Sequence, residues 1–264
     1  MRHPLRFALA FFAVITLASL YPARAAFANG RFPEAQQIAL APHGGDPNLV
    51  DMRTTFGIVV SRDAGKSWTW ICEAALGFNG NWDPPIAITK DGTIWVGLPD
   101  GLRSTHDGCS SDEIADFHGD RVSDLTVDAS GESVFVLTSP LDRPARVSVI
   151  HPHGKVERIA GEFPGIQLTT IESAASSGKL YVTGAPYGKG PRPHLFMGAR
   201  GKPLVEVTVD LPEKTNIYIS EIDPKNDAHL VLRTLTPSGS DIYVTSDGGK
   251  TFTSTLHVPT LLYG

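Results

Sequence analysis

The chain has 264 residues, with 23 Lys and Arg, 28 Asp and Glu, and a formal net charge of −5. Residues 1–25 contain three of the basic residues and none of the acidic ones, so the remainder is more acidic still. Binding to phosphate backbones needs clustered basic charge, and this balance therefore argues against nucleic acid as a partner.

The first 25 residues have the pattern of a secretory signal peptide. Arg2 and Arg6 precede an uncharged apolar run over residues 7–20, and Ala23 and Ala25 follow in the small-x-small pattern that signal peptidase reads. This run is shorter than the roughly 20 residues that span a bilayer. We expect cleavage after Ala25, no lipid anchor, no membrane span in the mature chain, and a secreted or periplasmic location.

A turn of eight residues occurs twice, as "SRDAGKSW" and "TSDGGKTF". Weaker copies lie between the two; the second copy has His106 where the two complete turns have Asp, and the third and fourth copies keep only the glycine. The copies start at Ser61, Ser104, Ile150, Met197 and Thr245. Even spacing of 43 to 48 residues is typical of a tandem structural repeat.

Each copy is surrounded by short runs of alternating apolar residues. Around the first copy these are "AQQIALA", "NLVDMRT", "TFGIVVS" and "SWTWIC". Period-2 runs bounded by Gly, Pro, Asp and Ser predict β-strands, and four strands in about 45 residues are typical of a β-propeller blade. The sequence therefore predicts an all-β propeller over residues 26–264 with five four-stranded blades. A five-bladed ring and a truncated ring of six or seven blades both stay open.

The residues of the two complete turns are expected to be structural. Asp63 and Asp247 can accept hydrogen bonds from nearby backbone N–H groups, and Gly65 and Gly249 allow a positive φ. The aromatic residue that follows each turn is expected to fill the gap against a neighbouring sheet. The full structural set is Ser61, Asp63, Gly65, Ser67, Trp68, Thr245, Asp247, Gly249, Thr251 and Phe252. Catalytic or Ca²⁺-binding roles for the two Asp are the less favoured alternative.

The pattern Ser-x-Asp-x-Gly-x-Ser-Trp at Ser61 resembles the Asp-box, or bacterial neuraminidase repeat. That repeat occurs in sialidase-like propellers, in the sortilin receptor, in xyloglucan-cleaving glycosidases and in photosystem II assembly propellers. The stretch "RTTFGIVVSRDAGKSWTWICEAALGF", with "GC" further on, is also similar to secreted bacterial propellers of this superfamily. The resemblance implies the fold, but unrelated activities share it.

A sialidase-like activity would need three Arg forks for a carboxylate, an acid, and a Tyr nucleophile. The candidates are Arg53, Arg103 and Arg233 for the forks, Asp83 for the acid and Tyr187 or Tyr243 for the nucleophile. A glycosidase with paired carboxylates could instead use Asp83 with Asp100 or Asp142. The Arg-Ile-Pro signature of sialidases is absent from the chain.

A non-catalytic role in binding a protein or glycan is the favoured function, with a glycoside hydrolase as the alternative. Phe78, Trp82 and Asp83 precede the second blade, on the face expected to carry a site, and suit sugar stacking or a protein contact. Trp82 could equally pack between blades. No cofactor is expected, and no metal site, because "HPH" at residues 151–153 supplies only two local ligands.

Cys72 and Cys109 are the two cysteines of the chain. In an exported protein such a pair more often forms a disulfide than a reactive site. We therefore predict a disulfide that ties the last strand of the first blade to the turn of the second. Two free thiols are the alternative.

Overall fold

The computed structural model describes residues 33–78, 82–159, 163–186, 193–199, 201–211, 215–236 and 238–260. The chain divides into two units, residues 1–30 and 31–264, and all described residues belong to the second. Within them, no helix is long and apolar enough to cross a membrane. The predicted signal peptide and Tyr187 lie outside the described residues.

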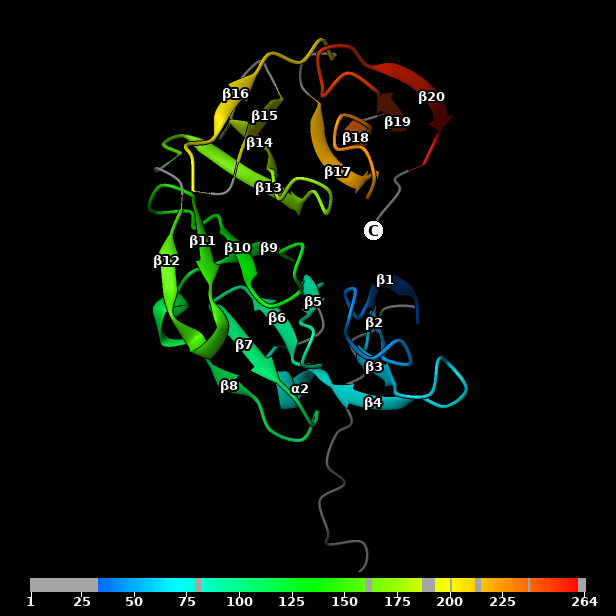
Figure 1. Cartoon of the computed structure of the whole chain (residues 1–264), viewed down its shortest axis with the longest axis vertical. Coiled ribbons are helices and arrows are strands. Elements are labelled where there is room, and N and C mark those ends of the chain that lie inside the picture. Colours follow the sequence, from blue (N-terminus) through cyan, green and yellow to red (C-terminus); the bar gives the residue numbers. More distant parts are fainter. Residues whose placement is uncertain are drawn as a thin grey trace, which may run out of the picture. The chain divides into compact units, whose positions relative to one another are not determined.

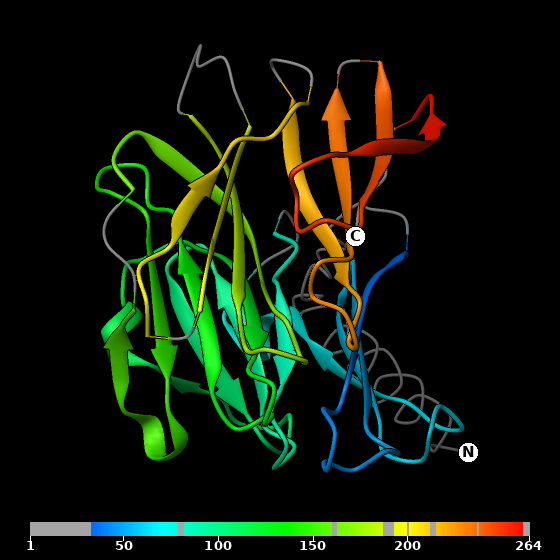
Figure 2. The ribbon, with the colours of Figure 1, turned by 45° about the horizontal axis from the view of Figure 1, so that its top comes forward.

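The described strands form five four-stranded antiparallel sheets that follow one another around a ring (Figure 1). Figure 2, in which the ring is tilted, shows successive strands of a blade joined by turns at alternate ends. This is a β-propeller, and the predicted fold class is confirmed.

The bounds of the elements follow the chain, one blade after another. Blade 1 contains β1 (Ala35–Leu40), β2 (Val50–Thr54), β3 (Gly57–Ser61) and β4 (Thr69–Cys72), followed by the short helix α2 (Glu73–Leu76). Blade 2 contains β5 (Ile86–Ile88), β6 (Ile94–Leu98), β7 (Gly101–Thr105) and β8 (Asp112–Glu113), followed by the 3-10 turn η1 (Ala115–Phe117). Blade 3 contains β9 (Val122–Val127), β10 (Val134–Thr138), β11 (Arg146–Ile150), the 3-10 turn η2 (Pro152–Gly154) and β12 (Val156–Arg158). Blade 4 contains β13 (Ile166–Ser173), β14 (Leu180–Pro186), β15 (His194–Gly198) and β16 (Val205–Val207). Blade 5 contains β17 (Asn216–Ile222), β18 (Leu230–Thr236), β19 (Gly239–Thr245) and β20 (Thr253–Val258).

The third strand of every blade ends at or one residue after the start predicted for its repeat. In blade 2 the predicted register is wrong by one residue, because the turn begins at Thr105 and Asp107 takes the Asp position. The backbone N–H groups of Cys109 and Ser110 donate to Asp107 Oδ1 over 2.8 and 3.0 Å. The N–H of Gly108 donates to Thr105 Oγ1 over 2.9 Å. His106, two residues into the predicted copy, is therefore not the equivalent of Asp63.

The turn of blade 1 is closed by the carboxylate of Asp63. Asp63 Oδ1 accepts the backbone N–H of Ser67 over 2.8 Å, and Oδ2 accepts its hydroxyl over 2.6 Å. Ser61 Oγ donates to Asp63 and accepts the N–H of Gly65, whose φ is 86°. These hydrogen bonds, first among them those from Ser67, lower the pKa of Asp63 from 3.8 to about 2. Asp247 closes the turn of blade 5 through matching bonds to Thr245 and Thr251.

The aromatic residues after these two turns lie differently. Phe252 packs against the apolar cluster between blades 4 and 5, so its ring fills the gap against the neighbouring sheet, as the sequence predicts. Trp68 instead folds back over its own turn, where its Nε1 donates to the carbonyl oxygen of Gly65 over 3.1 Å. The gap-filling role predicted for Trp68 is therefore wrong, and its ring stays exposed.

Blades are held together by apolar clusters between successive sheets. We call the face of a blade that packs on the next blade its forward face, and the opposite face its backward face. Ile58 and Val60 of blade 1 pack on Ile94 and Val96 of blade 2. Matching clusters join blades 2 and 3, 3 and 4, and 4 and 5. Complete burial of one such side chain contributes about 1.5–3 kcal/mol, so these clusters are the main source of stability.

The backward face of blade 1 is not covered by such a cluster among the described residues. Ile38 and Leu40 of β1 pair with β2 at the positions that Ile86 and Ile88 of β5 occupy in blade 2. Ile38 and Leu40 are 64% and 65% exposed, whereas Ile86 and Ile88 are 2% and 1% exposed. The sequence of β1 is thus apolar on a face that other blades bury.

Replacement of Asp63 by Ala is expected to lower the melting temperature, because it leaves the N–H of Ser67 without its acceptor at a tight turn. Ser67→Ala removes one hydroxyl and should cause a smaller loss. Circular dichroism melts would measure both. The exposed Asp116→Ala serves as control, and an equal loss in that variant would contradict a specific role for the turn.

Candidate functional site

The three arginines predicted as carboxylate forks have different neighbours. Arg53 Nη1 donates to the carbonyl oxygen of Pro84 over 3.4 Å. Arg103 Nη1 donates to Ser111 Oγ over 3.2 Å, and the guanidinium lies near Glu113. The guanidinium of Arg233 stacks over the ring of Tyr218 at 4.8 Å. The three guanidinium groups therefore interact with different residues.

The predicted ligand-binding residues lie around the contact between blades 1 and 2. Phe78 is buried in the apolar cluster that joins these blades, and Trp82 packs against the same cluster. Trp82 Nε1 donates to the carbonyl oxygen of Gly97 over 2.8 Å, and the guanidinium of Arg121 lies 5.2 Å from its ring. Because the ring of Phe78 is buried in the core, only Trp82 and Asp83 of the three predicted residues are placed to contact a ligand.

Cys72 and Cys109 are free thiols in the structure, which differs from the predicted disulfide. Cys72 is half-buried and Cys109 is exposed. The residues that precede them are in contact, because a Cβ at Gly108 would lie 2.7 Å from Ile71 Cδ1. The two cysteines thus lie on neighbouring segments, and their pairing stays a prediction.

Two carboxyl groups on the first strands of blades 3 and 4 form a polar cluster that the sequence analysis missed. Asp124 Oδ2 accepts the backbone N–H of Ile171 over 2.8 Å, so blade 3 is bonded to blade 4. Glu172 Oε2 accepts the hydroxyl of Thr126 over 3.1 Å and completes a second link between the same blades. Both side chains are half-buried. Acidic residues inside apolar first strands, as in "SDLTV" and "TTIES", are the signal that could have identified them.

Both carboxyl groups hold their protons more tightly than usual. Desolvation raises the pKa of Asp124 from 3.8 to about 7, although a hydrogen bond from Ile171 and the charge of Arg53 act in the opposite direction. Desolvation also raises the pKa of Glu172 from 4.5 to about 8, and the neighbouring charges of Asp124 and Glu221 add to the effect. Near neutral pH this cluster can therefore donate as well as accept a proton.

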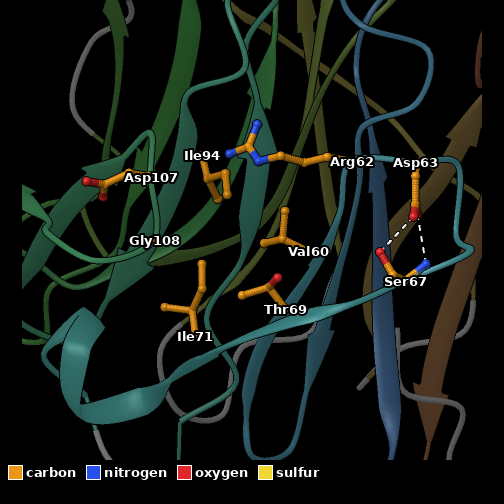
Figure 3. Close-up of a pocket in the computed structure, with 9 residues that line it drawn as sticks. All are labelled: Val60, Arg62, Asp63, Ser67, Thr69, Ile71, Ile94, Asp107 and Gly108. Carbon is orange, nitrogen blue, oxygen red and sulfur yellow. Dashed lines mark hydrogen bonds between the residues drawn. The ribbon is translucent and has the colours of Figure 1, made fainter.

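A surface pocket of ≈ 210 Å³ lies between blades 1 and 2 (Figure 3). Apolar side chains from both blades line it, together with a single basic residue, Arg62. Arg62 reaches from blade 1 to blade 2, where its Nη2 donates to the carbonyl oxygen of His106 over 2.8 Å. The lining residues are Val60, Arg62, Asp63, Ser67, Thr69, Ile71, Ile94, Asp107 and Gly108. In the described part of the chain, no group of three or more His, Cys, Asp or Glu is placed to hold a metal ion.

No protein-family model matches the chain, and no curated protein matches its sequence. Solved structures with the same fold do match. The GH74 enzyme of Niastella koreensis superposes with a TM-score of 0.61 at 15% identity, over 83% of this chain and 38% of that one. The structure of YCF48 bound to D1 peptide superposes with a TM-score of 0.54 at 13% identity, over 85% of this chain and 67% of that one. A chain of a nidogen/laminin complex superposes with a TM-score of 0.58 at 14% identity, over 87% of this chain and 84% of that one.

These similarities show a β-propeller fold and nothing more specific, because identities of 13–15% carry no functional assignment. The chain spans only about two fifths of the GH74 enzyme. The matched proteins include both an enzyme and propellers solved in complexes, so the fold is compatible with catalysis and with binding.

The raised pKa values predict that the protein becomes less stable as the pH rises. A carboxyl group with a higher pKa in the folded chain binds its proton more tightly when folded, so its stabilisation is present at about pH 4 and is lost as the pH rises through about 8. In Glu172→Gln the free energy of unfolding should depend less on pH. Near pH 9 it should be larger than that of the wild type by about 1–3 kcal/mol. Urea unfolding across this pH range would measure it, with Glu206→Gln as an exposed control. An unchanged slope in Glu172→Gln would contradict the assignment.

Proposed function

We propose that this chain is an exported propeller that binds a protein or a glycan without catalysing a reaction. Support comes from an exposed aromatic surface on blade 1, which we call the aromatic patch and which consists of Phe56, Trp68 and Trp70. These side chains are 36%, 43% and 59% exposed. Exposed aromatic clusters are more common at binding sites than on the rest of a protein surface.

The polar atoms of the two tryptophans are already used inside the protein. Trp70 Nε1 donates to the carbonyl oxygen of Phe56 over 2.8 Å, and Trp68 Nε1 bonds within its own turn. Phe56 and Trp70 meet edge to face, with ring centroids 6.5 Å apart. The rings are therefore held in place, and they offer apolar faces that a partner can cover at little cost in conformational entropy.

We further propose that the chain is an Asp-box propeller of the sialidase-like superfamily. This assignment is supported by the turns at Ser61 and Thr245 and by the hydrogen bonds of their Asp residues. Matches to YCF48 bound to D1 peptide and to a nidogen/laminin complex agree with a propeller used for binding. Export, whether to the periplasm or outside the cell, rests on the first 25 residues.

Truncation of Trp70 to Ala is expected to weaken binding by about 2 kcal/mol, or roughly 30-fold in Kd, as for a central aromatic contact. A glycan array, together with photo-crosslinking in the exported protein fraction, would identify the ligand, and titration would compare the variants. Leu141→Ala, a change to an exposed side chain of blade 3, is the control. Equal binding by wild type and Trp70→Ala would contradict a role for the aromatic patch.

A glycoside hydrolase is the second candidate, and one observation favours it. Asp124 and Glu172 are neighbouring carboxyl groups with pKa values raised to about 7 and about 8. Glycosidases use one carboxyl group as acid and another as base or nucleophile, and a raised pKa keeps the acid protonated near neutral pH. The match to a GH74 enzyme agrees with this candidate but does not carry it.

Assays on xyloglucan and on a fluorogenic sialoside would separate the two functions. A hydrolase that uses this pair should lose at least about 100-fold in kcat in Glu172→Gln, while Glu206→Gln keeps full activity. Turnover that persists in Glu172→Gln would exclude the pair as the catalytic groups. No turnover by the wild type, with binding retained, would favour the non-catalytic function.

A further inference from the structure

Blade 1 is attached to the rest of the propeller through one apolar face. No cluster of packed residues covers its backward face in the described part of the chain, where Ile38 and Leu40 are 64% and 65% exposed. Its forward face packs on blade 2 through the cluster that contains Ile58 and Val60. A sheet must bury an apolar face against another element, so blade 1 depends on its contact with blade 2.

A carboxyl group lies in the middle of this contact. Asp51 on β2 pairs with Ala39 on one side and with Val60 on the other. Directly paired residues lie on the same face of a sheet, and both Ala39 and Val60 pack in the cluster that joins blades 1 and 2. Asp51 is 0% exposed, and neither of its carboxylate oxygens has a hydrogen-bond partner among the described residues.

The other blades do not have an acid at this position. The position follows the residue of the second strand that pairs with the last residue of the third strand, as Val50 pairs with Ser61 in blade 1. In blades 2 to 5 the same position holds an apolar or aromatic residue, namely Trp95, Phe135, Tyr181 and Val231. The packing of the blades therefore does not require Asp51.

The charged residues around this contact do not pair with Asp51. Arg53 and Arg62 donate to backbone carbonyl oxygens. Asp63 and Asp107 accept the N–H groups of their own turns, and Arg103 lies near Glu113. Of these groups, Arg62 acts on Asp51 through its charge without a hydrogen bond.

Ionisation of Asp51 and close packing of the two blades oppose each other. An ionised carboxyl group in an apolar contact is costly unless it is paired, whereas the neutral acid is tolerated better. Desolvation accordingly raises the pKa of Asp51 from 3.8 to about 7, although the charge of Arg62 acts in the opposite direction. Separation of the blades would give the ionised group access to water.

We propose that the contact between blades 1 and 2 is a pH-sensitive switch, in which blade 1 packs on blade 2 while Asp51 is protonated and separates from it when Asp51 ionises. The inference concerns this contact alone and does not depend on the aromatic patch or on any ligand.

The direction of the pH dependence follows from the two states of Asp51. The packed state binds the proton more tightly than the open state, so the packed state is favoured at low pH and loses this advantage as the pH rises through about 7. The equilibrium constant for opening should rise by up to about tenfold per pH unit between about pH 5 and pH 7, and should level off above about pH 8.

The test is amide hydrogen exchange of the full mature protein from pH 5 to pH 9, corrected for the intrinsic exchange rate at each pH. The central strands β2 and β3 report on blade 1, because an uncovered sheet loses its ladder hydrogen bonds. Their protection in the wild type should fall by up to about tenfold per pH unit below pH 7. Protection of β2 and β3 that does not depend on pH would overturn the proposal.

Variants assign the effect to Asp51. In Asp51→Asn, which cannot ionise, the protection of β2 and β3 should change little with pH. Asp51→Val, with the residue of blade 5, should also show little dependence and should raise protection at pH 8 at least about tenfold over the wild type. The exposed Asp116→Asn is the matched control and should keep the wild-type slope.

Glu172→Gln distinguishes opening of blade 1 from unfolding of the whole chain. Glu172 lies at the contact between blades 3 and 4, so its replacement should leave the slope of β2 and β3 unchanged. The proposal is overturned if Asp51→Asn keeps the wild-type slope. It is also overturned if Glu172→Gln flattens the slope as much as Asp51→Asn does, because the whole chain would then open at once.

Discussion

The packing of one blade's forward face on the next blade's backward face is the constraint on which this structure depends. A four-stranded sheet has two faces to cover, and blades 2, 3 and 4 cover both with their neighbours. The alternating apolar pattern of the strands must therefore be kept in every repeat. A turn only has to close a hairpin, and in blades 3 and 4 a glycine with positive φ, at Gly154 and Gly201, remains where the full turn sequence is lost.

The positions that depart from this packing pattern have buried carboxyl groups or exposed aromatic rings. Asp51 stands where blades 2, 3 and 4 have an aromatic residue, and its carboxylate is buried without a hydrogen-bond partner among the described residues. Asp124 and Glu172 place carboxyl groups on first strands and link blades 3 and 4 through single hydrogen bonds. Trp70 leaves a large ring exposed on the outer strand of blade 1. Each departure costs stability in a fold built on apolar contact, which makes these positions the best candidates for function.

The sequence was sufficient to predict the repeat, the strand content and the fold, because strand periodicity and turn spacing are local signals. The register of the turn at Thr105 was missed, because the sequence alignment placed His106 at the Asp position, whereas the Asp that closes the turn, Asp107, is one residue further along the chain. The site was much harder to predict. Which side chains meet across two blades depends on packing between residues some 50 positions apart, as for Thr126 and Glu172. The burial of Phe78 and the separate partners of Arg53 and Arg103 follow from that packing as well.

Amide hydrogen exchange, followed by mass spectrometry, tests the packing account most directly. Strands that are covered on both faces should be the slowest to exchange, and strands of the half-covered terminal blade should be faster. We therefore expect strong protection in β9 and β10 of blade 3 and clearly weaker protection in β1, whose Ile38 and Leu40 are exposed. Protection of β1 equal to that of β9 would contradict the account, because it would mean that apolar contact between blades does not determine stability here.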